Sequence, residues 1–248
     1  MSEINWINFR GEDSRDYGIL IGKNNFSARA ERDVESVSVP GRDGDVIIDN
    51  GKFKNVQISC ELSLFSEENS IFSNSDNFYY SWDEAAEWLK SDGNYYRLHS
   101  SYDTEHYRLA CLSQGIEADN SQHWSVGKTK VSFNCKPYRY RFDGDTIHEI
   151  TELNSILINP EKYDSLPYIK ITGSGTIVLI IGSNSFTFNN VSRYIECDSE
   201  NMTVYKGTTN LSNKFVSSYF PKLKPGRNQI AWSGTVSKIE IKPRWRTR

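Results

Sequence analysis

The chain has 248 residues, of which 37% are hydrophobic and 25% are charged, so it holds enough apolar material for packed cores and is not a disordered protein. This length suits one large β domain or two smaller domains. The formal net charge of −3 excludes strong nucleic-acid binding, because such binding requires clustered Lys and Arg. The aromatic content of 13% favours pleated sheets and protein interfaces.

No targeting or membrane-spanning segment is expected. Residues 1–9 include Glu3 and no apolar run, which excludes a signal peptide, and the longest apolar run, 177–181, has the length of a buried strand. The four cysteines at positions 60, 111, 135 and 197 lie far apart and show no Cys-x-x-Cys spacing. We therefore expect free, buried thiols in a protein made in the cytoplasm.

The first half of the chain shows period-two alternation and short β-branched runs broken by turn residues, which is the pattern of antiparallel strands. Strands are predicted over residues 34–39, 46–48 and 56–64. Between the last two, Asp49-Asn50-Gly51-Lys52 supplies residues that tolerate positive φ. We expect the strands that flank this segment to form a hairpin.

One segment of the first half has helical spacing. Its apolar residues recur three and four positions apart, at Trp82, Ala85, Ala86, Trp88 and Leu89. Ser81 and Glu84 fit a capping box at the start of the predicted helix. The helix should end near Ser91-Asp92-Gly93, where glycine can adopt the left-handed backbone conformation.

The alternating pattern loosens between residues 140 and 159, and Phe142-Asp143-Gly144-Asp145 is typical of a turn. We therefore predict two domains, residues 1–142 and residues 143–248. Closely spaced short strands in the second half indicate a β-sandwich, and they are predicted at 168–171, 177–181, 186–188, 194–197, 203–205, 229–232 and 238–241. Gly173-Ser174-Gly175 lies between two of these strands and predicts a tight turn.

The sequence shows no complete catalytic or metal-binding motif. The histidines at 99, 106, 123 and 148 show no metal-binding spacing and accompany no Gly-x-Ser-x-Gly motif. Asp43, Asp45 and Asp49 match a calcium loop only in part, because no Glu stands twelve positions along the loop that begins at Asp43. We predict no catalytic residue, no metal and no cofactor.

A basic cluster lies at positions 242, 244, 246 and 248, where Lys242, Arg244, Arg246 and Arg248 alternate with other residues. This alternation favours a solvated strand end over a binding site.

The most specific local signal lies between two predicted strands, in the segment Val39-Pro40-Gly41-Arg42-Asp43-Gly44-Asp45. Pro40 fixes φ and Gly41 can follow at positive φ, so the pair fits the middle of a type II turn. Charged residues held on a stiff turn suit recognition of a neighbouring protein, because little entropy is lost on docking. Arg42, Asp43 and Asp45 are therefore the candidate interface residues, and a solvated hairpin tip is the alternative.

The segment from Val39 to Asp45, downstream of Asp16-Tyr17-Gly18-Ile19, resembles the distal tail protein family of siphophages that infect Gram-positive bacteria. The resemblance spans nearly the whole chain. It continues through Ala85-Ala-Glu-Trp-Leu89, Tyr95-Tyr-Arg-Leu98, Tyr107-Arg-Leu-Ala110, Val131-Ser-Phe-Asn-Cys-Lys-Pro-Tyr-Arg-Tyr140, Pro167-Tyr-Ile-Lys-Ile-Thr-Gly-Ser-Gly175, Ile195-Glu-Cys-Asp-Ser199 and Leu223-Lys-Pro-Gly-Arg-Asn-Gln-Ile-Ala-Trp232.

This resemblance implies an all-β protein with one short helix, made of an N-terminal β-sandwich-like ring domain and a C-terminal galectin-like β-sandwich. It implies a hexameric hub ring at the tail tip of the virion, assembled in the bacterial cytoplasm. The ring would join the tail tube protein to the tail-tip or tail-associated lysin protein and could carry receptor-binding proteins. DNA would pass its lumen without specific binding, and neither a membrane nor an enzymatic reaction is implied.

Two other classes of function are weighed against a structural virion protein. A carbohydrate-binding adhesion module would need exposed aromatic side chains, and Trp232 and Trp245 are the candidate platform, although both lie in alternating segments where a core position fits equally well. A wall-degrading hydrolase would need paired carboxylates in a cleft, and no pair stands out in the sequence.

Overall fold

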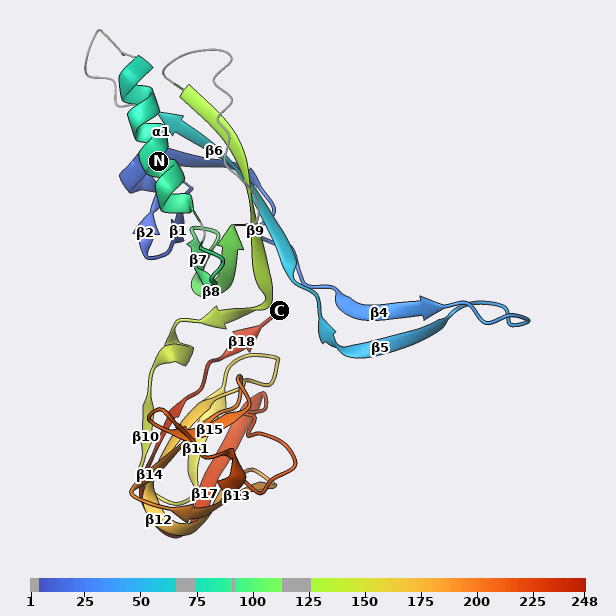
Figure 1. The fold of residues 1–248 in the computed structure, drawn as a ribbon, viewed down its shortest axis with the longest axis vertical. Helices are drawn as coiled ribbons and strands as arrows, with labels where there is room; N and C mark the ends of the chain where they lie inside the picture. The colour runs from blue at the N-terminus through green and yellow to red at the C-terminus, as the bar shows by residue number, and fades with distance from the viewer. Residues whose placement is uncertain (1–4, 66–74, 91, 113–125) are drawn as a thin grey trace. The chain divides into compact units, whose positions relative to one another are not determined.

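The computed structural model describes residues 5–65, 75–90, 92–112 and 126–248 (Figure 1). The chain divides into two compact units, residues 1–139 with Arg248 and residues 140–247, which we call the N-terminal and C-terminal units. Strands dominate both, and α1 (Ser75–Leu89) is the one α-helix in the described ranges, so the predicted all-β class with one helix is confirmed. The division precedes the predicted boundary after residue 142, and the roles assigned to the two parts stay predictions.

One antiparallel sheet has the strand order β2-β1-β7-β8-β9-β6-β3, with β18 paired to β9. Its strands are β1 (Ile7–Phe9), β2 (Glu12–Asp13), β3 (Ile19–Asn24), β6 (Val56–Phe65), β7 (Tyr96–Ser100), β8 (Asp103–Leu112), β9 (Val126–Arg141) and β18 (Arg246–Thr247). The alternation in β6 sets the apolar face of this sheet. Every second residue from Val56 to Leu64 is buried, and the residues between them are polar.

The helix α1 packs against the apolar face of this sheet. Ala85, Trp88 and Leu89 belong to the same buried cluster as the inward side chains of the strands. The Trp88 Nε1 donates a hydrogen bond to the backbone oxygen of Phe9 at 2.9 Å, and the Trp88 ring stacks on Tyr17 with centroids 4.8 Å apart. The polar atom of this large buried side chain is thereby satisfied.

The start of α1 differs from the prediction. The helix begins at Ser75, so Ser81 lies inside it and the capping box of Ser81 and Glu84 is wrong. A cap needs a residue with non-helical backbone before the first turn, and here helical backbone precedes Ser81.

The end of α1 agrees with the prediction, since the helix ends at Leu89 and Gly93 follows with a φ of 86°. Ser91, which belongs to the predicted stop, lies outside the described residues. Among the helices in the described ranges, none has the length and apolarity that crossing a bilayer requires.

The strands that flank Asp49-Asn50-Gly51-Lys52 do not form the predicted hairpin. β5 (Val46–Phe53) runs through this segment and pairs with β4 (Arg32–Val37), whereas β6 pairs with β3 and β9. Gly51 takes a φ of 71° and donates its N–H to Asp49 Oδ1 at 2.8 Å, beside a register shift in the β4–β5 pairing. The segment forms an irregularity in a continuous strand, because a bulge uses the same backbone freedom as a turn.

The C-terminal unit is a second antiparallel sheet with the order β10-β17-β12-β14-β15-β16, in which β11 pairs with β17 and β13 pairs with β12. Its strands are β10 (His148–Ile150), β11 (Ser155–Asn159), β12 (Tyr168–Ile181), β13 (Asn184–Val191), β14 (Tyr194–Asp198), β15 (Thr203–Lys206), β16 (Thr209–Asn210) and β17 (Gly226–Lys242). Two pairs of predicted strands are thus fused, each into one long strand, β12 and β17.

These two long strands take part in two layers. Residues 168–172 of β12 pair with β14 and with residues 238–242 of β17, while residues 178–181 pair with β13 and with residues 230–233 of β17. The inward side chains of both halves belong to one buried cluster. The strands therefore bend so that one half packs over the other, which gives the sandwich that the sequence predicted.

The bend explains Gly173-Ser174-Gly175, for which a tight turn between two strands was predicted and is wrong. A Cβ at Gly173 would lie 2.2 Å from the carbonyl oxygen of Thr235, and one at Gly234 would lie 2.4 Å from that of Thr176. The β12–β17 register shifts at the same place. Two backbones approach each other here more closely than any side chain permits, so the glycines serve bulges inside continuous strands.

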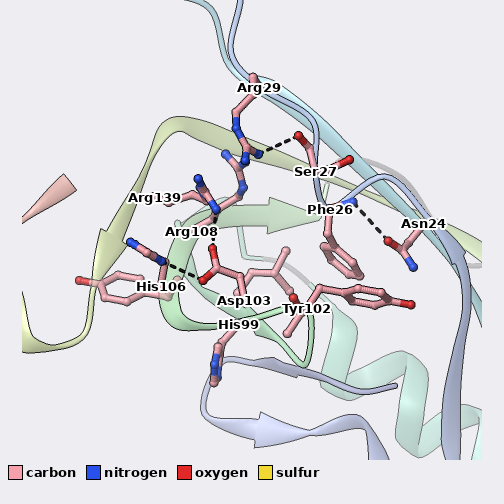
Figure 2. A pocket seen from close by; sticks show the side chains of 13 residues that line it. Asn24, Phe26, Ser27, Arg29, His99, Tyr102, Asp103, His106, Arg108 and Arg139 are labelled. Atoms are coloured by element: carbon pink, nitrogen blue, oxygen red, sulfur yellow. Dashed lines mark hydrogen bonds and ion pairs between the residues drawn. The ribbon is translucent and has the colours of Figure 1, made fainter. Parts of the chain in front are cut away.

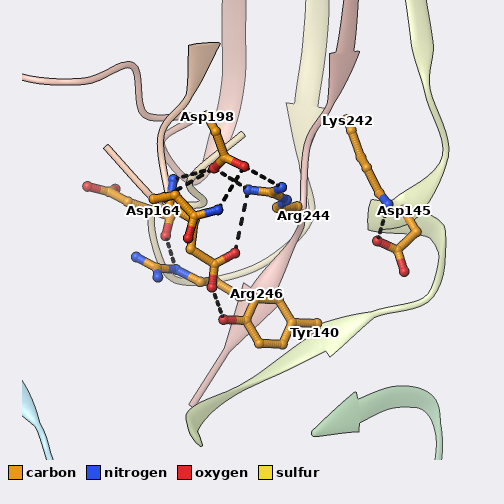
Figure 3. A network of polar contacts seen from close by, with 9 residues as sticks. Tyr140, Asp145, Asp164, Asp198, Lys242, Arg244 and Arg246 are labelled. Carbon is orange, nitrogen blue, oxygen red and sulfur yellow. Dashed lines mark hydrogen bonds and ion pairs between the residues drawn. The ribbon is translucent and has the colours of Figure 1, made fainter. Parts of the chain in front are cut away.

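A polar network in the C-terminal unit surrounds Asp198, whose side chain is 7% exposed (Figure 3). Arg244 donates to it from Nη1 and Nη2 at 2.7 and 3.0 Å. Lys242 pairs with Asp145 at 3.1 Å, and Arg246 donates Nε to a backbone carbonyl at 2.7 Å. The expected solvated strand end is therefore wrong for these three basic residues, because each has a partner inside its own unit.

The close approach at Gly173 predicts a steric penalty for any side chain. Gly173→Ala should lower the free energy of unfolding by about 2–3 kcal/mol, since the added methyl group overlaps a backbone carbonyl that cannot move freely. Gly175→Ala is the matched control: its φ is 79° but the space around it is open, so it should cost only about 1 kcal/mol. Urea unfolding followed by circular dichroism measures both, and equal losses would contradict the steric explanation.

The Asp198 pair predicts a specific dependence on pH. Burial acts to raise the pKa of Asp198, but the hydrogen bonds from Arg244 and from the Asn201 backbone outweigh it and lower the pKa. A lowered folded pKa stabilises the fold above the ordinary carboxyl pKa, and this contribution is lost as the pH falls through the folded value.

Asp198→Asn should therefore cost about 3 kcal/mol at neutral pH and flatten the loss of stability below about pH 4. Unfolding measured from pH 2 to 7, with the exposed Glu152→Gln as control, tests this expectation. A variant with the steep acid limb of the parent chain would contradict it.

Candidate functional site

The strands β4 and β5 form a two-stranded sheet that pairs with no other strand of the described chain. We call residues 32–53 the arm, which is the blue ribbon of β4 and β5 in Figure 1. Large aliphatic side chains are exposed along it: Ile47 is 68% exposed, Ile48 47%, and Val34 and Val37 both 41%. Exposed aliphatic side chains gathered on one element mark an interaction surface.

The register of the arm places aliphatic side chains on both of its faces. Directly opposed residues share a face, so Val37 and Ile48 lie on one side, while Val34 and Ile47 lie on the other. Among the described residues, neither of the two core clusters covers either face. Because a two-stranded ribbon alone is marginally stable in water, the arm is suited to being covered by another molecule.

The base of the arm is held by charges and aromatic rings. The carboxylate of Asp49 accepts the Nε–H of Arg32 at 2.6 Å, and this hydrogen bond lowers the pKa of Asp49. The guanidinium groups of Arg32 and Arg248 lie over the ring of Phe53 at 5.4 and 4.8 Å, and Tyr138 meets this ring edge-on at 6.0 Å. The base is thus fixed by contacts within the N-terminal unit.

The tip of the arm is the predicted turn. The backbone oxygen of Val39 accepts the N–H of Arg42 at 3.2 Å, and Gly41 takes a φ of 80°, so the type II turn is confirmed. Arg42, Asp43 and Asp45 are exposed, and their side chains have no ion pair within the described part of the chain. The structure places the three predicted interface residues in one loop between β4 and β5, with Arg42 closing the turn and Asp43 and Asp45 following it, and their contact with a partner stays a prediction.

Sequence reasoning missed the aliphatic faces of the arm. Val46-Ile47-Ile48 has the composition of a buried strand, and the pattern holds no sign of which molecule buries it. One signal was available in the sequence. Three consecutive apolar residues stand directly after a solvent-exposed turn, and such an exposed run is unusual unless it is functional.

Of the histidines considered as metal ligands, His106 has a structural partner. His106 donates from Nδ1 to the Asp103 carboxylate at 2.8 Å, and His123 lies outside the described residues. No group of three His, Cys, Asp or Glu side chains that could hold a metal is found among the described residues.

The four cysteines are free thiols, as the sequence predicted. Cys60, Cys135 and Cys197 are buried, and burial raises the pKa of each thiol to about 12, while Cys111 is half-buried. Thiols with such raised pKa values are inert at neutral pH.

The candidate glycan platform is not available at Trp245. This side chain is 3% exposed and lies in the core of the C-terminal unit, because the alternation of the chain near its end turns it inward. Trp232 is partly buried and packs against the same core.

No family model matches the sequence, and no curated protein matches it significantly. Among solved structures, the chain is similar to SPP1 Dit (gp 19.1), a hub adsorption apparatus protein of Gram-positive infecting phages, with a TM-score of 0.74 and 11% identity over 96% of this chain and 98% of that one.

Two structures of the phage p2 baseplate in its activated conformation are also similar. The structure with Sr gives a TM-score of 0.51 and 11% identity over 99% of both chains. The structure with Ca gives 0.50 and 12% identity over 96% of this chain and 98% of that one. The likeness therefore extends over the whole length of the chain and shows a shared fold.

The exposure of the arm predicts that its aliphatic side chains contribute little to the stability of an isolated chain. The double variant Ile47→Asn and Ile48→Asn should change the free energy of unfolding by less than about 0.5 kcal/mol, because these side chains are exposed. The buried Ile58→Ala should cost about 3 kcal/mol by comparison. Denaturant unfolding of dilute protein measures both, and a large loss in the arm variant would show that the chain itself covers the arm.

Proposed function

We propose that this chain is a distal tail protein of a long-tailed phage that infects a Gram-positive bacterium, and that it builds a hub ring at the tip of the tail. The observation that carries the proposal is the full-length likeness to the SPP1 Dit hub protein. It is supported by an arm that presents aliphatic side chains on both faces and a charged turn at its end.

A ring requires a heterologous interface, in which one patch of a subunit contacts a different patch of the next. The arm suits this role because the described chain leaves its two faces and its two open strand edges uncovered, so that another chain can cover them. We propose that the arm docks on a neighbouring copy and that six copies close the ring. Arg42, Asp43 and Asp45 then lie at the end of the docked segment.

Further roles follow from a hub position. The ring would connect the tail tube protein to the tail-tip or tail-associated lysin protein, and could hold receptor-binding proteins at its periphery. DNA would pass through its lumen without specific contacts. The bent, two-layered C-terminal unit fits the galectin-like sandwich of this family, and the site of assembly would be the bacterial cytoplasm.

A structural role without catalysis fits the ionisable groups of the described chain. The carboxylates with clearly lowered pKa values are each held by a structural partner: Asp13 by Arg15, Asp49 by Arg32, Asp92 by Tyr96, Asp103 by His106 and Arg139, and Asp198 by Arg244. These ion pairs, and the hydrogen bond that Tyr96 donates to Asp92, explain the shifts without a reaction. The carbohydrate-binding alternative is not favoured, because Trp245 is buried.

The proposal predicts that the purified chain forms a closed ring in which the arm is essential. Light scattering with negative-stain imaging should show a ring with a central hole. The double variant Ile47→Asn and Ile48→Asn should remain folded and shift to monomer, because it removes apolar side chains from both faces. A parent chain that stays monomeric at high concentration, or a variant that still forms rings, would defeat the proposal.

The tip makes a separate prediction. Arg42→Glu and Asp43→Lys reverse single charges that have no partner in the described chain, so each should leave stability unchanged and weaken assembly. Lys128→Glu, which reverses an exposed charge on β9, is the control and should assemble normally. Normal assembly of both tip variants would exclude the turn from the interface.

A further inference from the structure

A pocket of about 370 Å³ lies in the N-terminal unit, away from the arm's two strands (Figure 2). Its lining comes from three places in the chain: the end of β3 with the segment that follows it, strands β7 and β8 with their turn, and strand β9. This volume exceeds that of a phosphate or carboxylate group. The pocket is thus large enough to admit a small ion or the end of a side chain.

Positive charge dominates the pocket. Figure 2 shows the guanidinium groups of Arg29, Arg108 and Arg139 gathered on one side of it, with the Asp103 carboxylate beside them. Asp103 is the one carboxylate in the lining, and it already accepts hydrogen bonds from Arg139 Nη1 at 2.5 Å and from His106 Nδ1 at 2.8 Å. Three guanidinium charges therefore share the pocket with a single carboxylate, which already accepts a hydrogen bond at each of its oxygens.

Arg108 is the unusual member of this group. The residue is 5% exposed; its Nη2 donates to the backbone oxygen of Ala28 at 2.8 Å, whereas its Nη1 is buried without a hydrogen-bond partner in the described chain. The Nε of Arg139 is also buried without a partner. Burial lowers the pKa of Arg108 to about 10, but the group stays charged at neutral pH.

A buried guanidinium with an unmade hydrogen bond destabilises a protein, and here the half-buried Arg139 adds a second buried N–H without a partner beside it. Native structures rarely keep such groups without a ligand, an ion or water. An oxyanion would offset the excess charge and accept the free N–H groups, and the planar fork of arginine matches carboxylate and phosphate oxygens.

We propose that this pocket binds an oxyanion, either a free phosphate or the carboxylate of an acidic side chain from another protein segment. Arg108 is its buried anchor, and Arg29 is an exposed member of its lining. The site rests on the geometry of one unit and does not depend on ring assembly.

The test is a titration of the full chain at constant ionic strength with two probes, using calorimetry and thermal unfolding. The first probe is inorganic phosphate, with chloride as its control. The second is a synthetic peptide of residues 36–47, which carries Asp43 and Asp45, with the same peptide bearing Asn at both positions as its control. We expect saturable binding of at least one probe and a rise in the unfolding temperature with it.

Variants localise the binding. Arg29→Gln, at an exposed position, should keep the fold and weaken binding about tenfold, the loss expected for one charged contact. Arg108→Lys keeps the charge but loses the fork, and it should weaken binding further. Lys128→Gln removes one positive charge outside the pocket and should bind as the parent chain does.

Binding of phosphate alone identifies a free anion as the ligand, and tighter binding of the peptide than of its Asn control identifies an acidic protein segment. Both results support the pocket. The proposal is overturned if neither probe binds saturably, or if Arg29→Gln and Arg108→Lys bind as tightly as the parent chain.

Discussion

The two-stranded arm pairs with no other strand of the described chain, and it carries exposed aliphatic side chains on both of its faces. Val37 and Ile48 lie on one face and Val34 and Ile47 on the other, all of them at least 41% exposed. The rest of the N-terminal unit accommodates this constraint: the base of the arm is fixed through Arg32, Asp49 and Phe53, so that the exposed part starts from a defined position. A stiff turn at the far end completes a segment suited to docking.

In the C-terminal unit, two layers are built from few strands because the two long strands β12 and β17 take part in both. Two long strands pass through both layers, and this is possible only where Gly173 and Gly234 let the backbones approach each other. One apolar cluster fills the space between the layers, while the end of the chain is fixed by ion pairs such as Arg244 with Asp198. Removing one partner of such a pair lowers the free energy of unfolding by more than the intact pair contributes to it, because a charge is left buried without a partner. The network therefore fixes the position of the chain end more than it adds stability.

The arm and the arginine pocket are two places in the described N-terminal unit where side chains lie in energetically unfavourable surroundings. The arm exposes apolar surface, and the pocket gathers positive charge around the buried Arg108, whose Nη1 has no hydrogen-bond partner in the described chain. Elsewhere the core strands alternate regularly and large polar side chains such as Trp88 find partners. In natural proteins, locally unfavourable features of this kind are concentrated at functional surfaces.

The sequence by itself determined the features that depend on residues close together along the chain. The alternation of β6 set its buried face, Pro40 and Gly41 set the turn, the spacing of Ala85, Trp88 and Leu89 set the helix, and the separation of the cysteines indicated free thiols. These features follow from backbone preferences and from periodicity, which are local properties.

Only the tertiary structure decided which strands pair and what each surface faces. Gly51 and Gly173 suit a turn and a bulge equally well, so the sequence could not show that β5, β12 and β17 continue through such segments. Val46-Ile47-Ile48 has the composition of a core strand, and its exposure depends on the absence of a third strand beside the arm in the described chain. Arg29, Arg108 and Arg139 come from distant parts of the sequence, and they meet because β8 and β9 pack beside the segment that follows β3; contacts of that range leave no local pattern.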